Sequence, residues 1–136
     1  MLKAHSMKWF RQNLVWAIRG VAIVFRTQAS ARIQAGAAVF AIGAGFFFKI
    51  DRIEWLAVTG VIGLVLMAEA FNTSLEALAD ALHPERHPLI GRAKDMAAGA
   101  VFLAAIAATA VGAIVFLPKV LTWLTLPPQN STLPPN

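Results

Sequence analysis

Apolar residues gather in three stretches of the chain, at residues 35–48, 55–68 and 96–117. Only the third reaches by itself the length of about 20 residues that a helix needs to cross a bilayer. The first two reach it with their flanks, because Gln34, Lys49 and Glu54 can extend to the headgroup region. The pattern predicts membrane helices over about 33–50, 54–82 and 96–117. The second of these would project well beyond the hydrocarbon.

An earlier segment, residues 7–26, has the periodicity of an amphipathic helix. Its apolar residues fall within roughly 80° of arc and its polar residues on the other side: Phe10, Leu14, Ala17, Val21 and Val24 against Lys8, Gln12, Arg19 and Arg26. Such a helix lies in the membrane interface, with its basic face toward phosphates and its tryptophans at headgroup depth. It can be a plain anchor or contribute to a site.

Two breaks separate these segments. Residues 27–33, TQASARI, interrupt the apolar periodicity and predict a bend or a short connection. In HPERHPLIGRAKD, two His-Pro pairs disfavour continued helix, and Pro88 suits the first turn of the next one. We therefore divide the chain into a surface helix with its connection at 1–32, a three-span core at 33–120 and a Pro-rich, disordered tail at 121–136.

Composition supports the membrane assignment. The 136 residues are 58% hydrophobic and 14% charged, which is too apolar for a soluble domain of this size. The predicted fold class is an all-α membrane protein with an N-terminal amphipathic interfacial helix and three transmembrane helices. The chain has no cysteine, so disulfides and thiolate metal sites are excluded.

The distribution of charge predicts an orientation. The net charge of +5 arises largely from the first 34 residues, which hold basic side chains and no acid. Because this surplus lies beside membrane segments, anionic headgroups rather than nucleic acid are the expected partner. Residues 80–95 contain Arg86, Arg92 and Lys94, whereas residues 49–54 contain only two basic residues, balanced by two acids. Three spans with a cytoplasmic N-terminus satisfy the positive-inside rule.

A polar stripe runs along the second membrane helix. Five residues fall within roughly 60° of one another on one face: Glu69, Asn72, Thr73, Glu76 and Asp80. A carboxylate at the centre of a bilayer costs about 2.5 to 3.5 kcal/mol, so such a stripe needs a reason. Glu69, the deepest, suits a general base for an alcohol, and Glu76, nearer water, suits a hard cation. The alternative is that these side chains only hydrogen-bond across helices.

A second group of candidates begins the third span. In GRAKDMAAG, Lys94 and Asp95 lie on the same predicted side as Glu76 and Asp80, and a lysine can bind phosphate as a point charge. A snorkelling lysine is the simpler interpretation. His83 and His87 lack a third nitrogen ligand and are interpreted as loop residues. The chain has no Walker A motif and no protein-kinase catalytic loop, so a kinase here would be of an unusual kind.

The segments MAEAFNTSLEALAD and HPLIGRAKDMAAGAV resemble the prokaryotic diacylglycerol kinase family. Glu, two residues, Asn, three residues and Glu, then Ala-Lys-Asp after a loop, form its specific pattern, and the resemblance covers residues 13–120. The second segment and FLPKV look similar to the Gram-positive branch, which phosphorylates undecaprenol. The enterobacterial branch acts on diacylglycerol.

The resemblance implies a homotrimer in the bacterial cytoplasmic membrane, with active sites shared between neighbouring chains. It implies transfer of the γ-phosphate from ATP, with Mg²⁺, to a lipid alcohol. By motif, Glu69 is the base, Glu76 a ligand of the metal and of ATP, and Asn72 and Asp80 are supporting polar residues. The resemblance places six further residues at the nucleotide: Trp16, Glu85, Arg86, His87, Lys94 and Asp95.

One position departs from the family pattern. The family has a metal-binding glutamate where this chain has Gln28. An amide oxygen can still coordinate Mg²⁺, though without the charge that helps to hold it.

The hypothesis that follows is a lipid kinase, with undecaprenol favoured and diacylglycerol as the alternative substrate. A more distant alternative is a non-catalytic membrane scaffold or an ion-conducting oligomer, because intramembrane acids also mark ion paths.

Overall fold

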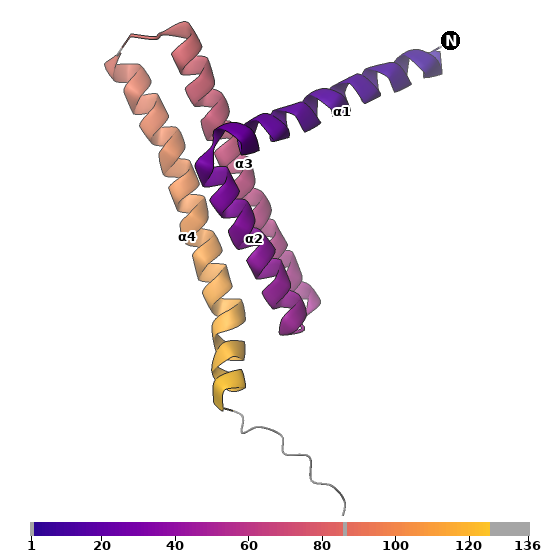
Figure 1. Ribbon diagram of the computed structural model, residues 1–136, viewed down its shortest axis with the longest axis vertical. Coiled ribbons are helices and arrows are strands. Elements are labelled where there is room, and N and C mark those ends of the chain that lie inside the picture. Colours follow the sequence, from indigo (N-terminus) through magenta and orange to yellow (C-terminus); the bar gives the residue numbers. More distant parts are fainter. Residues whose placement is uncertain (1, 86, 126–136) are drawn as a thin grey trace, which may run out of the picture.

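The computed structural model describes residues 2–85 and 87–125, and this part of the chain is all-α. It contains α1 (Leu2–Thr27), α2 (Ala29–Phe47), α3 (Arg52–Leu82) and α4 (Pro88–Thr125). As Figure 1 shows, α2, α3 and α4 form a bundle from which α1 projects, and α3 packs against both of its neighbours. The all-α class and the helical conformation of residues 7–26 are confirmed.

The three bundle helices have the character of membrane spans. α2, α3 and α4 are each long and apolar enough to cross a bilayer. Large apolar side chains such as Phe40, Phe71 and Phe102 are exposed on their outer surfaces. Surfaces of this kind match hydrocarbon or other helices rather than water. The fold is that of an integral membrane protein with three candidate spans.

The junction between α1 and α2 is sharper than predicted. Gln28 is the single residue between the two helices, so residues 29–33, expected as part of a connection, form the first turn of α2. The Arg32 guanidinium donates hydrogen bonds to the carbonyl oxygens of Phe25 at 3.1 Å and Arg26 at 3.3 Å. These carbonyls lie at the end of α1, where a helix lacks backbone partners. One side chain of α2 thus supports the bend.

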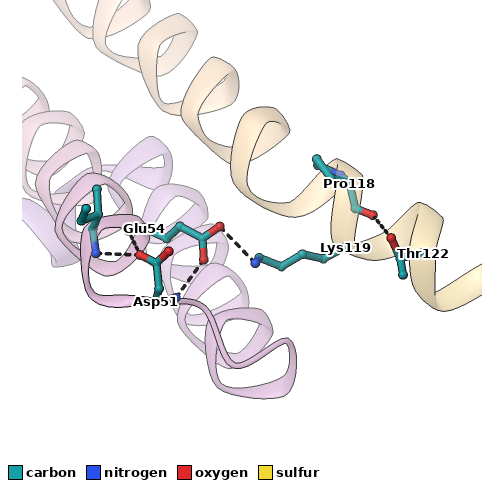
Figure 2. Close-up of polar contacts among 6 residues, drawn as sticks. Asp51, Glu54, Pro118, Lys119 and Thr122 are labelled. Atoms are coloured by element: carbon teal, nitrogen blue, oxygen red, sulfur yellow. Dashed lines mark hydrogen bonds and ion pairs between the residues drawn. The ribbon is translucent and has the colours of Figure 1, made fainter.

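A short turn joins α2 to α3. Lys49 adopts a positive φ of 51°, and the Asp51 side chain then caps α3 by accepting hydrogen bonds from the backbone N–H groups of Ile53 at 2.8 Å and Glu54 at 2.9 Å. The Glu54 carboxylate accepts in return from the Asp51 N–H at 2.8 Å, which completes a capping box (Figure 2). This reciprocal pair fixes where α3 begins.

Glu54 also ties α3 to α4. Its Oε1 lies 3.0 Å from the Nζ of Lys119, as Figure 2 shows. Beyond the apolar run, α4 continues through Pro118 to Thr125, so residues 121–125 of the predicted tail are helical. Membrane helices tolerate a proline, which removes one backbone hydrogen bond within the helix. One turn further on, Thr122 Oγ1 donates to the Pro118 carbonyl at 2.9 Å. The rest of the predicted disordered tail, 126–136, lies outside the described residues.

Replacing Asp51 by Ala should lower the free energy of unfolding by about 1 kcal/mol, because the cap of α3 loses its acceptor. Asp51→Asn keeps an acceptor and should remain close to the wild type. Reversible unfolding in mixed detergent and SDS micelles, followed by circular dichroism, measures both. An equal loss in the two variants would argue against the cap.

Candidate active site

The polar stripe of α3 runs from the protein interior to water. Glu69 is 4% exposed and Thr73 is 8% exposed, whereas the Asp80 side chain is 69% exposed. Glu69 is therefore the most enclosed carboxylate of the stripe, in the order expected from the sequence. The buried end lies where the junction of α1 and α2 meets α3, and α3 continues beyond this level to the α3–α4 loop (Figure 1).

Two side chains of α2 hold the Glu69 carboxylate. Ser30 Oγ donates a hydrogen bond to Glu69 Oε1, and Gln34 Nε2 donates to Oε2 at 3.3 Å. Sequence reasoning missed both residues. Ser30 was assigned to a connection, and Gln34 was interpreted as a flank that reaches the headgroups. The available sequence signal was the spacing of Ser30 and Gln34, two polar residues one helical turn apart and therefore on one face of a helix. This spacing does not identify Glu69 as their partner.

A second carboxylate, that of Glu76, lies between two amides. Gln28 Nε2 donates to Glu76 Oε2 at 3.5 Å, and Asn72 Nδ2 donates to Oε1 at 3.3 Å. The structure thus brings together three of the predicted site residues. Asn72 Oδ1 is buried and has no hydrogen-bond partner within the described part of the chain. A carbonyl oxygen of this kind, beside a carboxylate, can act as a ligand for a hard cation.

The oxygen atoms around Glu76 are suited to form part of the coordination shell of a Mg²⁺ ion. Mg²⁺ is usually bound through one or two carboxylates, with waters and substrate phosphates completing its shell. Glu76 offers the carboxylate, and the amides of Asn72 and Gln28 offer carbonyl oxygens once the Gln28 amide turns its oxygen toward the ion. Across residues 2–85 and 87–125, no three His, Asp or Glu side chains cluster into an all-protein metal site.

Four of the predicted nucleotide residues line a cavity at the α3–α4 loop, and Glu76 is not among its lining residues. It has a volume of about 490 Å³, and its walls include Asp80, Glu85, His87, Lys94 and Asp95. Lys94 Nζ lies 2.8 Å from Asp80 Oδ1, so this ion pair joins the end of α3 to the start of α4. An ammonium group has three N–H donors, and a pair with one carboxylate oxygen leaves others for phosphate. Arg86 lies outside the described residues.

Trp16 is not brought to this loop cavity. It is 57% exposed on α1, where it lines a separate cavity with the basic residues Lys8, Arg11 and Arg19. The residues that line these two cavities do not overlap. Within one chain, Trp16 therefore lies outside the cavity that Lys94 and Asp95 line.

An apolar cavity of about 280 Å³ lies between α2, α3 and α4. Its walls are mostly aliphatic, and Gln34 contributes an amide. Because Gln34 also donates a hydrogen bond to Glu69, one side chain connects the buried carboxylate to this cavity.

The chain is similar in sequence to known proteins over most of its length. Residues 15–116 match the family described as prokaryotic diacylglycerol kinase. The chain is 35% identical over 115 residues to an undecaprenol kinase of Bacillus subtilis, covering 85% of this chain and 94% of that protein. It is 39% identical to a diacylglycerol kinase of Synechocystis, over 79% of this chain and 61% of that protein. It is 30% identical to the diacylglycerol kinase of Escherichia coli, over 79% of this chain and 81% of that protein.

The class of protein defined by these findings is an integral membrane lipid kinase. The chain belongs to the prokaryotic diacylglycerol kinase family, and the resemblance in its α3 and α4 motifs is confirmed.

Proposed function

We propose that the chain transfers the γ-phosphate of ATP to the hydroxyl of a membrane lipid alcohol, with Glu69 as general base. Glu69 takes the hydroxyl proton, the lipid oxygen bonds to the γ-phosphorus, and the bond from that phosphorus to the leaving oxygen breaks to give ADP. The observation that carries the proposal is the position of Glu69. It is 4% exposed and accepts hydrogen bonds from two neutral donors, one of which, Gln34, lines an apolar cavity.

The phosphates would lie between Glu76 and the loop cavity. Glu76 follows Glu69 by about two helical turns, which separates the base from the cation-binding oxygens along one face of α3. Glu76, Asn72 and Gln28 would hold Mg²⁺, which when bound neutralises charge on the transferring phosphoryl group. Lys94 would contact the phosphates, with Asp95, Glu85 and His87 around the rest of the nucleotide. Catalysis of this kind depends mainly on positioning and charge.

Undecaprenol is the favoured substrate and diacylglycerol the runner-up. The relative named undecaprenol kinase is matched over 94% of its length at 35% identity. The relatives named diacylglycerol kinase show 39% and 30% identity, over 61% and 81% of their lengths. Coverage of the relative's length favours the single-chain prenol, and the aliphatic cavity that Gln34 lines is compatible with such a tail.

A homotrimer with shared sites is part of the proposal. Trp16 and the loop cavity are separate within one chain, so a tryptophan from a neighbouring chain would be the one that meets the base of ATP. The exposed apolar surfaces of the spans leave room for such packing. We place the protein in the bacterial cytoplasmic membrane with its N-terminus, the α1–α2 junction and the α3–α4 loop toward the cytoplasm.

Replacing Glu69 by Gln should lower kcat roughly 10²- to 10⁴-fold, because the amide cannot accept the hydroxyl proton. Assembly and ATP binding should be retained. Glu54→Gln is the matched control: it changes a glutamate of the same helix outside the site, and Gln still serves in a capping box. Transfer of label from ATP to lipid measures both. A Glu69→Gln enzyme with the wild-type rate would end the base assignment.

Replacing Gln28 by Glu should reduce the Mg²⁺ concentration that gives half-maximal activity, because two adjacent carboxylates hold the ion more strongly than one. Arg52→Gln is the control, since it changes the net charge by the same amount about 36 Å from Glu76 along α3. A magnesium titration of activity compares the variants. If Gln28→Glu leaves the titration unchanged, Gln28 does not belong to the metal site.

In a mixed-micelle assay that contains undecaprenol and diacylglycerol together, undecaprenol should receive most of the label. The ratio of the two labelled products gives the ratio of the kcat/KM values. A product mixture dominated by phosphatidic acid would show that diacylglycerol is the preferred substrate.

A further inference from the structure

Ser30 and Gln34 of α2 have no part in the proposed chemistry so far, yet they contact its central residue. They lie one helical turn apart and therefore on one face of α2. Each donates to a different oxygen of Glu69. Ala31 on the same side of α2 is 1% exposed, and its small side chain lets the helices approach closely. The first turns of α2 thus form a cradle for one carboxylate.

The two side chains that donate to Glu69, Ser30 and Gln34, are uncharged. The ion pairs found among the described side chains are Lys94 with Asp80 and Lys119 with Glu54, and neither includes Glu69. A buried carboxylate without partners is costly, so it needs hydrogen bonds. A paired cation would bind the same lone pairs and oppose uptake of a proton. A hydroxyl and an amide hold the carboxylate in place, and the carboxylate can still accept a proton.

The Glu69 carboxylate also determines how the Gln34 amide is oriented. Nε2 must face the carboxylate, because two oxygens there would repel each other. Gln34 Oε1 therefore points away from Glu69, where it is buried and has no partner within the described residues. Since Gln34 lines the apolar cavity, one amide joins the carboxylate to the space proposed for the lipid tail.

We propose that Ser30 and Gln34 are positioning residues that hold both oxygens of Glu69 in the orientation in which it receives the lipid hydroxyl proton. This inference rests on the proposed function, in which Glu69 is the base. Each carboxylate oxygen has about two lone-pair sites, so one donor on each oxygen leaves a free site for the substrate. The orientation of that free site is set by α2, not by α3, which carries the base.

The test compares Ser30→Ala and Gln34→Met with the wild type in the lipid phosphorylation assay. Loss of one donor lets the carboxylate rotate, and kcat should fall roughly 10- to 100-fold. KM for ATP should stay within about 2-fold, because Lys94 and the loop cavity are untouched. Ser30→Thr retains the hydroxyl and should restore kcat. Rates are expressed per folded protein, taken from the monodisperse fraction in gel filtration.

Ser74→Ala is the matched control. Ser74 lies between Asn72 and Glu76 in the sequence of α3, but its side chain is exposed on another face and its hydroxyl donates to the Ala70 carbonyl of its own helix, at 2.8 Å. Its loss should leave kcat unchanged. A wild-type kcat in both Ser30→Ala and Gln34→Met, or a Ser30→Thr enzyme as slow as Ser30→Ala, would overturn the inference.

The same series separates this inference from the proposed function. If Glu69→Gln is inactive and the two α2 variants are fully active, the base assignment stands and the positioning role is wrong. If Glu69→Gln keeps the wild-type rate, the proposed function itself fails.

Discussion

The arrangement of this protein depends on one constraint, which is that a carboxylate buried among apolar helices must find hydrogen-bond donors. Glu69 is 4% exposed, and both of its oxygens are bonded to side chains of α2. For this to happen, α2 must begin immediately after Gln28 and approach α3 closely, and Ala31 at 1% exposure permits that approach. The sharp bend after α1 and the packing of α2 on α3 thus serve the same residue.

From this buried carboxylate, α3 carries the site outward. Glu76 lies between the amides of Gln28 and Asn72, and Asp80 pairs with Lys94 at the start of α4. One continuous helix therefore places three carboxylates in three environments. Glu69 lies in the interior, Glu76 lies between two amides, and Asp80 is exposed. At the outer end of this series, the loop cavity is lined by residues of both helices, among them Asp80, Lys94 and Asp95.

Much of this organisation could be predicted from the sequence, because strong periodicity predicts membrane helices and a polar stripe within an apolar run is conspicuous. The stripe on α3 and the start of α4 at Pro88 follow from such local patterns. The roles of Ser30 and Gln34 could not be predicted in the same way, since both lie at the edge of an apolar run and their partner is 39 and 35 residues away. The Glu54–Lys119 pair at the other end of the bundle could not be predicted for the same reason, whereas the capping box joins two residues only three apart and is a local pattern that the sequence analysis missed.

The most direct test of the account is phosphate transfer by the purified chain in a lipid bilayer, with labelled ATP, Mg²⁺ and a panel of long-chain alcohols. The account predicts label in the lipid fraction that depends on the added alcohol, with undecaprenol the best acceptor. ATP consumption without labelled lipid, or no transfer to any alcohol of the panel, would contradict it.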